Sequence, residues 1–478
     1  MEEVRLAPRS PDDLARVVGQ ERFQRLISSD AEAMRSALRG RSVININSTP
    51  AGGGVAEMLQ VLLPLSRGLG VDARWFVIDG DEAFFELTKR LHHMLHGSAG
   101  DGGGLSGDDA RHYELVMRRN TEALSANVVP GDVVVLHDPQ TAGMAEHLHA
   151  MGVAVVWRCH IGTDISNAWT KEAWTFLRTY VEPFVQGYVF TRRQYAPSWA
   201  ADELVHVIRP SIDPLAPKNA DMPREQVEAI LSYVGIVDGA RPEPVPFDRA
   251  DGSPGRVERF ADITRTGPPP EFDAPLVVQV SRWDPLKDMA GVMRGFVEHV
   301  LDGSDAHLVL AGPVVTAVAD DPEAAAVLDD VARAWRRLPH HQRSRVQLVC
   351  LPMSDLDENA VIVNALQRHA SVVVQKSLAE GFGLTVTEAM YKGTPVVASA
   401  VGGIVDQIED GSNGLLVESP TDLAEFGSDV SRLLDEPGLA KKLGEAGRAT
   451  VIDQFLPDTS LGRWQELLVP LLDKAAST

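Results

Sequence analysis

Two glutamates, Glu380 and Glu388, lie eight positions apart around a glycine-rich turn. An apolar run that ends at Val374 leads into this turn, and a helical pattern begins at Leu384. The spacing places Glu380 in the turn and Glu388 in the first turns of the helix, so the carboxylates do not share one helical face. The backbone amides around Phe382 are then free at a helix start, where their partial positive charge suits an anion. The stretch predicts a loop that binds an anionic ligand.

Two cations follow a strand pattern in the second half of the chain. Residues 276–281 have the composition of a buried strand, and Arg282 and Lys287 come soon after it. Open α/β sheets bind ligands at the carboxyl ends of their strands, so both cations are expected there, beside the Glu380 loop. Together they could hold a diphosphate and neutralise the charge of a departing nucleoside diphosphate. Without the Glu380 loop, two solvated cations on a turn would be the better interpretation.

An aspartate and three histidines are weaker candidates for ligand-binding residues. Asp138 and His160 each end a strand pattern, although a turn carboxylate and a structural histidine are the simpler interpretations when each is taken alone. His92 and His96 have a spacing that a metal could use on one helical face, but no carboxylate is placed to assist them. A polar helix surface is therefore favoured, and no metal is expected.

The bulk composition restricts the class of protein. The chain has 478 residues, of which 44% are hydrophobic and 23% charged, and its net charge is −22. The length favours two or three domains, and acidity without a Lys/Arg-rich run argues against a surface for nucleic acid or an anionic membrane. The sequence has no apolar run long enough to span a membrane, and its N-terminus does not resemble a secretory signal. The two cysteines are expected to be buried, reduced thiols. A cytoplasmic protein is expected.

Strand and helix patterns alternate in two series, which predicts two parallel sheets with helices on both faces. The expected strands are 43–47, 73–78, 132–136, 153–157, 187–190 and 204–208, then 276–281, 306–311, 345–350, 371–374, 395–398 and 414–417. The expected domains are an N-terminal extension (1–40), a first lobe (41–212), a Pro-rich insertion or linker (213–274), a second lobe (275–455) and a C-terminal helix (456–478). The predicted α/β fold has two doubly wound, Rossmann-like lobes that face each other across a cleft.

The second lobe resembles a known enzyme family. It is similar to the retaining glycosyltransferases of family 4, which have the GT-B fold, in the stretches EGFGLTVTEAM (380–390) and GTPVV (393–397). This resemblance covers most of residues 275–420. It implies that Glu388 binds the ribose hydroxyls, that Glu380 lies beside the donor sugar, and that the two cations bind the diphosphate. The donor site is then expected to comprise Gly53, Gly54, Arg282, Lys287, Glu380, Gly381, Phe382, Gly383, Leu384 and Glu388.

The first lobe resembles the trehalose glycosyltransferring synthases in particular. The similar segments are NSTPAGGGVAEM (47–58), ARWFVIDG (73–80), FFELTK (84–89), HDPQ (137–140) and WRCHI (157–161). One departure lies at Gly162 and Thr163, which precede Asp164 where an acidic residue is expected directly after Ile161. Sugar hydroxyls of the acceptor are expected to contact Asp138, Gln140, Arg158, His160 and Asp164.

The resemblance also implies a reaction. Glucose would move with retention from a nucleoside-diphosphate glucose (ADP-, UDP- or GDP-glucose) to free glucose, which gives α,α-trehalose. The diphosphate would depart toward the two cations, and the acceptor hydroxyl would attack the same face of an oxocarbenium-like species, with a departing phosphate oxygen as base. The lobes would close over the substrates. No metal and no cofactor besides the donor are expected, and the catalytic residues are expected to be His160, Arg282, Lys287 and Glu380.

Several alternatives stay open. A retaining trehalose phosphorylase shares the resemblance but uses inorganic phosphate, so a ribose-binding Glu388 would have no purpose in it. A different sugar or a cyclitol could also be the acceptor. A dinucleotide-dependent dehydrogenase is disfavoured because the first glycine loop is not G-x-G-x-x-G, and a silent sugar-binding regulator is disfavoured because the candidate site is complete. The expected partners are small-molecule sugars. The nucleotide, the direction of reaction and the oligomeric state are left open, with a homodimer among the alternatives.

Overall fold

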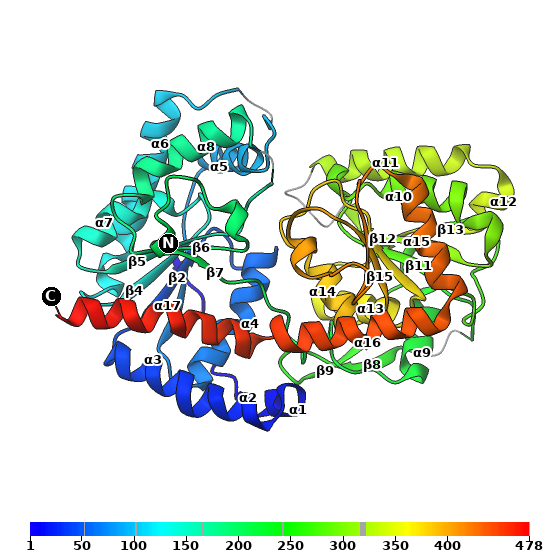
Figure 1. Ribbon diagram of the computed structural model, residues 1–478, viewed down its shortest axis with the longest axis horizontal. Coiled ribbons are helices and arrows are strands. Elements are labelled where there is room, and N and C mark those ends of the chain that lie inside the picture. Colours follow the sequence, from blue (N-terminus) through cyan, green and yellow to red (C-terminus); the bar gives the residue numbers. More distant parts are fainter. Residues whose placement is uncertain (52, 101–102, 165, 241–242, 316–321, 478) are drawn as a thin grey trace. The chain divides into compact units, whose positions relative to one another are not determined.

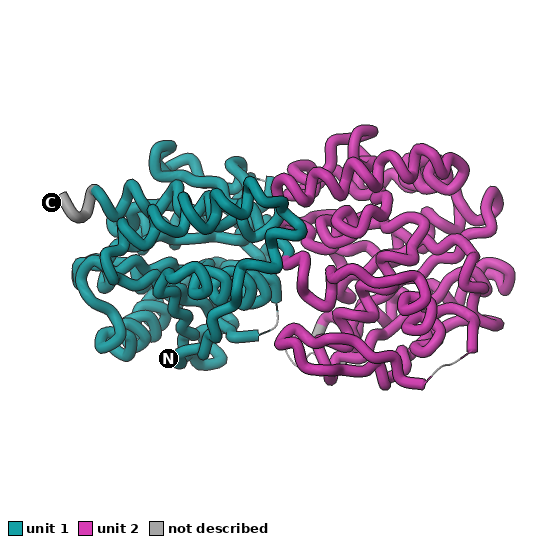
Figure 2. The backbone as a smooth tube through the Cα atoms, turned by 90° about the horizontal axis from the view of Figure 1, so that it is seen from below, with its two compact units in different colours: residues 1–212, 455–478 teal, residues 213–454 magenta. Residues whose placement is uncertain are grey.

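The chain separates into two compact units. The structure, a computed structural model, describes residues 1–51, 53–100, 103–164, 166–240, 243–315 and 322–477. Unit 1 comprises Met1–Ile212 with Phe455–Thr478, and unit 2 comprises Asp213–Gln454 (Figure 2). Each unit contains a seven-stranded sheet with helices packed on both faces (Figure 1).

The sheet of unit 1 has the strand order β1-β3-β2-β4-β5-β6-β7. The short β1 runs antiparallel to β3, and the other described strands run parallel. These strands are β1 (Glu2–Glu3), β2 (Val43–Asn47), β3 (Ala73–Val77), β4 (Val133–His137), β5 (Ala154–Cys159), β6 (Gly187–Phe190) and β7 (Val205–Val207). Valine and isoleucine dominate both faces of the central strands, as a sheet that is buried on both sides requires. The order of connection reverses between β2 and β4, which is where such sheets bind ligands.

Helices from both ends of the chain cover this sheet. One face packs against α5 (Glu82–Leu95), α6 (Gly107–Leu124), α7 (Ala145–Ala150) and α8 (Ala168–Val181). The other face packs against α3 (Ala31–Leu38), α4 (Gly54–Gly68) and the last helix, α17 (Pro457–Ser477) (Figure 1). The N-terminal extension also contains α1 (Ala15–Val18) and α2 (Gln20–Arg25), and Arg22 of α2 pairs with Asp458 of α17 at 2.7 Å. The two chain ends thus complete unit 1 together.

The sheet of unit 2 has the strand order β10-β13-β12-β11-β14-β15-β16, in which β10 is antiparallel to β13. These strands are β10 (Asp262–Thr264), β11 (Leu276–Val280), β12 (His307–Pro313), β13 (Val346–Leu351), β14 (Val372–Gln375), β15 (Val396–Ser399) and β16 (Leu415–Val417). One face packs against α10 (Met289–His299), α11 (Pro322–Arg337) and α15 (Leu423–Asp435). The other packs against α13 (Leu356–His369) and α14 (Leu384–Tyr391), with α16 (Pro437–Gln454) beside α14. The connection reverses between β11 and β14.

The proline-rich stretch 213–274 belongs to unit 2. It forms α9 (Arg224–Val234), the hairpin of β8 (Val245–Asp248) and β9 (Pro254–Val257), and the edge strand β10. The hairpin is tied to α13, because Arg249 donates to Asp355 at 2.6 and 2.9 Å, and the buried carboxylate of Glu358 accepts from the amides of Glu258 and Arg259 at 2.7 and 2.8 Å. The short strands of this stretch were not expected from the sequence.

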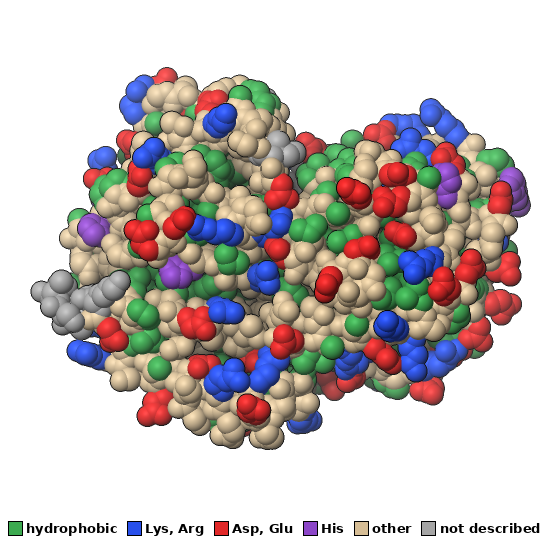
Figure 3. Space-filling model, viewed as in Figure 1, with side chains coloured by type: hydrophobic (Ala, Val, Ile, Leu, Met, Phe, Trp, Pro, Cys, Tyr) green, Lys and Arg blue, Asp and Glu red, His purple; other side chains and the backbone are tan. Residues whose placement is uncertain are grey.

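All strands expected from the sequence are present, with ends shifted by at most two residues. Their alternation with helices produces the two doubly wound sheets that were predicted. Among the described residues, no helix is both long and apolar enough to cross a membrane. Acidic and basic side chains are interspersed on the face in Figure 3, so the net charge of −22 is not gathered into one patch there.

Candidate active site

Glu388 of unit 2 has a buried carboxylate. It lies in the second turn of α14 and is only 3% exposed. Its Oε1 is 3.0 Å from the Nζ atom of Lys218, whereas its buried Oε2 has no hydrogen-bond partner among the residues that the structure describes. A buried polar atom without a partner costs about 1–3 kcal/mol, and more if charged. This oxygen is therefore suited to accept hydrogen bonds from a ligand.

A buried lysine donates a hydrogen bond to the backbone of Glu388. The Nζ atom of Lys392 is 3.0 Å from Oδ1 of Asn219, 2.9 Å from Oε1 of Gln367 and 3.2 Å from the carbonyl oxygen of Glu388. Burial lowers the pKa of Lys392 to about 7, although the nearby Glu388 opposes that change. The sequence did not identify Lys218 or Lys392 as site residues, because neither stands in a motif that signals a ligand.

Lys287 and Glu380 meet where the order of connection reverses in the sheet of unit 2. We call this place the switch point of the sheet. The Nζ atom of Lys287 lies 2.5 Å from Oε2 of Glu380, which also accepts from the hydroxyl of Ser377 at 3.2 Å. Both side chains are largely buried. Lys287 follows β11 and Glu380 follows β14, and these strands are neighbours. The structure thus brings together the cation and the carboxylate that were predicted at adjacent strand ends.

Asp288 fixes the backbone next to Lys287. It has a positive φ of 44°, which is uncommon for a residue other than glycine, and it caps α10 by accepting from the amide of Gly291 at 3.0 Å. Its carboxylate also forms an ion pair with Lys376, whose side chain is fully buried. Gln279 donates to the carbonyl oxygen of Lys287 at 2.8 Å. These contacts hold the loops after β11 and β14 as one block.

The glycine turn leads into α14 with bare backbone. Gly383 has a φ of +88°, and no side chain caps the helix that begins after it. A Cβ atom on Gly403 would lie 2.6 Å from the Cα atom of Phe382, so only glycine allows these loops to approach. Gln407 donates to the carbonyl oxygen of Phe382 and accepts from the Thr387 hydroxyl. The loop therefore presents helix-start amides in a fixed position, which favours an anion.

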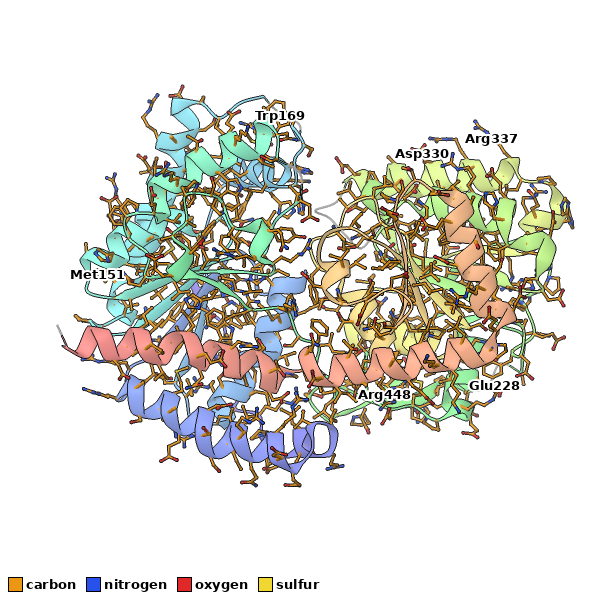
Figure 4. The ribbon with its side chains drawn as sticks, viewed as in Figure 1. Met151, Trp169, Glu228, Asp330, Arg337 and Arg448 are labelled. Atoms are coloured by element: carbon orange, nitrogen blue, oxygen red, sulfur yellow. The ribbon has the colours of Figure 1, made fainter. Side chains whose placement is uncertain are left out.

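Two further features frame this half of the site. Arg282 follows β11, its side chain is 65% exposed, and its Nη2 atom lies 3.2 Å from Oδ2 of Asp284. The rear of α14 is packed against α16, where the guanidinium of Arg448, labelled in Figure 4, lies 5.4 Å from the ring centre of Tyr391. The helix that carries Glu388 is thus held by unit 2 itself.

Asp138 and His160 meet at the carboxyl ends of β4 and β5, beside the place where the connection reverses in unit 1. They follow the neighbouring strands β4 and β5, and the Asp138 carboxylate accepts from the backbone amide of His160 at 2.7 Å. Asp138 has a φ of 63°, and the indole of Trp157 donates to its carbonyl oxygen at 3.0 Å. Such a backbone costs free energy, so its presence at a strand end indicates a functional constraint. Burial raises the pKa of Asp138 to about 7, and the His160 amide and Arg158 oppose the rise.

A chain of hydrogen bonds orients His160. Its Nε2 atom lies 3.0 Å from Nδ1 of His137, and Nε2 of His137 lies 3.0 Å from Oδ1 of Asn45. Burial and the nearby charge of Arg158 lower the pKa of both imidazoles, so both are neutral. Because the Asn45 oxygen can only accept, His137 carries its proton on Nε2 and accepts from His160 on Nδ1. The Nδ1 atom of His160 is then left as an acceptor, which suits a sugar hydroxyl.

The other predicted acceptor residues are placed differently. Gln140 has a buried Oε1 atom with no partner among the described residues. The carboxylate oxygens of Asp164 lie 2.8 and 3.0 Å from Nη1 of Arg192, which the sequence did not indicate. A Cβ atom on Gly162 would lie 2.1 Å from Cγ of Tyr195, so no side chain fits where the acidic residue was expected. Contact of Asp164 with the acceptor stays a prediction.

Arg158 lies inside unit 1, near the end of β5 and on the face of the sheet that α17 covers. It is 1% exposed, donates to the carbonyl oxygen of Ile208 at 3.3 Å, and lies 5.4 Å from the ring centre of Trp464. Its role as an acceptor contact stays a prediction. Gly53 has a φ of +103° with open space around it, and Gly54 begins α4 without a side-chain cap. Gly52, in the same motif, lies outside the described residues.

Comparisons with known proteins match both units. The family model described as trehalose synthase, N-terminal domain, matches residues 45–197, and the model described as glycosyl transferases group 1 matches residues 357–450. The trehalose synthase of Rubrobacter xylanophilus is 33% identical over 440 residues, which are 91% of each chain. The trehalose phosphorylase of Grifola frondosa is 24% identical over 96% of this chain and 60% of its own length.

Solved structures share the fold at low identity. The α,α-trehalose 6-phosphate synthase of Burkholderia multivorans has a TM-score of 0.63 at 14% identity, over 91% of this chain and 99% of its own. The Anabaena protein HepE, solved in complex with UDP and glucose, has a TM-score of 0.59 at 13% identity, over 90% of this chain and 99% of its own. The predicted GT-B fold class is confirmed by these similarities.

Proposed function

We propose that this chain, which belongs to the trehalose synthase family of GT-B glycosyltransferases, transfers glucose from a nucleoside-diphosphate glucose to free glucose and so forms α,α-trehalose. Membership of the family makes it a glycosyltransferase of trehalose metabolism. The donor, the acceptor and retention of configuration are the proposed parts.

The single observation that carries the choice of donor is the unpartnered oxygen of Glu388. One carboxylate oxygen is neutralised by Lys218, and the other is buried without a partner among the described residues. A ribose offers two adjacent hydroxyl donors, which is what a carboxylate in this position requires. Inorganic phosphate is an anion, so a carboxylate repels it. This favours a nucleotide donor over the phosphate of a phosphorylase.

The neighbouring block in unit 2 is suited to the diphosphate. Lys287, the exposed Arg282 and the uncapped start of α14 supply positive charge at one sheet edge. When the bond between the anomeric carbon and the phosphate oxygen breaks, its electron pair stays on the diphosphate, and these groups stabilise that charge. Lys287 is paired with Glu380, so we infer that the leaving group shares or replaces that carboxylate as its partner.

The half-site in unit 1 is suited to a neutral sugar. His160 presents Nδ1 as an acceptor, and the Asp138 carboxyl lies beside it with a pKa of about 7. We infer that both bind hydroxyl groups of glucose. The attacking hydroxyl forms the new bond to the anomeric carbon on the face that the diphosphate leaves, and its proton passes to a phosphate oxygen. No enzyme carboxylate forms a covalent intermediate in this scheme.

A panel assay tests the proposal. The protein is incubated with ADP-, UDP- or GDP-glucose and with glucose or other sugars, and the products are identified by NMR together with the released nucleotide. The proposal predicts α,α-trehalose and one equivalent of nucleoside diphosphate from at least one donor. Trehalose formation from glucose 1-phosphate and glucose, with no reaction of any nucleotide-glucose, would establish the phosphorylase instead. A disaccharide formed only with another acceptor would correct the acceptor alone.

A further inference from the structure

Unit 1 contains a cavity that the proposed reaction does not use. It has a volume of about 80 Å³ and lies on the face of the sheet covered by α3, α4 and α17. Its walls are mostly apolar, with Met34, Leu62 and Leu468 each coming from a different helix. Arg158 and His137 line it from the sheet. A water needs roughly 10–15 Å³ of such space, so the cavity is large enough for a small organic molecule.

Arg158 makes this cavity unusual. Its guanidinium is buried at 1% exposure, and its Nη1 atom has no hydrogen-bond partner among the described residues. Nη2 makes one long bond of 3.3 Å to the Ile208 carbonyl oxygen, and Trp464 lies 5.4 Å away at its ring centre. Burial lowers the pKa of Arg158 only to about 10, so the group remains a cation at neutral pH. Asp138 is near enough to raise this pKa, but Nη1 donates to no described residue, so the open donor is suited to an anion.

The shape and charge of the cavity restrict that anion. A carboxylate can accept from one guanidinium edge, while an apolar body fills the space between the helices. A phosphate dianion would bring more charge than Arg158 can neutralise between apolar walls. Asp30 also lines the cavity, and burial raises its pKa. We propose that this cavity binds a small organic carboxylate through Arg158.

The position of His137 gives such binding a consequence. His137 lines the cavity and also accepts from His160 at the strand ends. An occupant that contacts the imidazole of His137 would therefore alter the orientation of His160. This consequence rests on the proposed function, because it assigns His160 to the acceptor. The binding itself does not rest on it.

Binding is tested with benzoate and its neutral isostere benzamide, titrated calorimetrically into the full chain. The wild type should bind benzoate about tenfold more tightly than benzamide, since a hydrogen bond to a charged group contributes that much. Arg158→Met should remove this preference. Ala31→Leu, which fills the cavity from α3, should weaken both probes. Arg463→Met removes an arginine of α17 that is 59% exposed and does not line the cavity, and it should change neither.

Equal affinity for the two probes, or no binding of either, would overturn the proposal. Unchanged benzoate binding by Arg158→Met would also overturn it. Circular dichroism shows whether Arg158→Met folds. If it does not, the proposal is still tested by the preference of the wild type for benzoate over benzamide and by the weaker binding expected of Ala31→Leu. The calorimetric titration measures binding alone and does not depend on turnover. A failure to bind benzoate would therefore not argue against trehalose formation, and an absence of trehalose formation would not argue against benzoate binding.

Discussion

Units 1 and 2 have the same kind of sheet, yet their strand ends carry opposite chemistry. In unit 2 the switch point holds ion pairs, Lys287 with Glu380 and Lys218 with Glu388, next to an uncapped helix start. In unit 1 the switch point holds neutral imidazoles, because burial lowers the pKa of His137 and His160. The nearby Asp138 also shifts toward its neutral form.

Under the proposed function, this difference separates the two substrates by charge. A nucleoside-diphosphate sugar needs cations and helix-start amides, and its ribose needs a carboxylate. A free sugar is neutral and needs oriented donors and acceptors, which we propose that Asp138 and His160 supply. Each half-site contains a buried polar side chain that contacts a neighbouring residue: Lys376 pairs with Asp288 in unit 2, and Asn45 accepts from His137 in unit 1. We therefore expect variants of the two units to fail in different ways.

Lys287→Ala should have the largest effect. In the proposed mechanism it removes a cation that stabilises the leaving group, and it also removes the charged partner of Glu380, so kcat should fall by about 10²–10³-fold. The measurement is nucleotide release at saturating donor and glucose. Lys441→Ala is the matched control, since Lys441 lies on α16 and is 78% exposed. Turnover of Lys287→Ala near that of the control would remove Lys287 from the mechanism.

Glu388→Gln should have the next largest effect. The amide can no longer accept from both ribose hydroxyls, so the donor KM should rise by about 10- to 100-fold. A donor analogue with a 2′-deoxyribose should bind weakly to the wild type, and Glu388→Gln should reduce the affinity for this analogue only a little further. Glu445→Gln, at a 70% exposed position of α16, serves as the control. An equal loss with both donors would show that Glu388 does not contact the 2′-hydroxyl.

Asp138→Asn should change how stability depends on pH. The pKa of Asp138 is raised from 3.8 to about 7 in the folded state, so the folded wild type holds a proton that the unfolded chain has lost. The contribution of Asp138 to the free energy of unfolding therefore becomes less favourable as pH rises toward 7. Relative to wild type, the free energy of unfolding of Asp138→Asn should increase by up to about 2 kcal/mol between pH 5.5 and 7. Urea unfolding measures it, and a pH-independent difference would contradict the shift.

Asn45→Leu should have the smallest effect on catalysis. It removes the acceptor that fixes the proton of His137, so His160 is no longer held in one tautomer. The value of kcat/KM for glucose should fall by about tenfold, as loss of an oriented hydrogen bond does, while donor KM stays the same. Nitrogen chemical shifts of the imidazoles report the tautomer directly. Unchanged shifts with lowered activity would point to a packing defect instead.

The sheets and the donor loop could be predicted because their signals are local. Strand runs of valine and isoleucine alternate with helical patterns, and the glycine turn marks the start of α14. The strands β8, β9 and β10 were missed because they are three or four residues long and lie in a proline-rich stretch. Their formation depends on tertiary contacts with α13 and β13, which no local pattern reports.

The partners of the site residues were harder to predict. Lys218, Arg192 and Asn45 lie far along the chain from the residues they contact, and each has an ordinary sequence context. Arg158 did carry a usable signal. Successive residues of a strand face opposite sides of the sheet, so Trp157 and Arg158 cannot both point to the face that packs against α8. That alternation places Arg158 on the side of α17.

The central claim, that unit 2 binds the nucleotide and unit 1 the acceptor, is tested most directly by a crossed measurement on Glu388→Gln and His160→Ala. Calorimetry gives the Kd of the nucleoside diphosphate, and initial rates give kcat/KM for glucose at saturating donor. The account predicts that Glu388→Gln weakens nucleotide binding, while His160→Ala keeps it and loses transfer to glucose. Equal loss of nucleotide binding in both variants would contradict the division between the units.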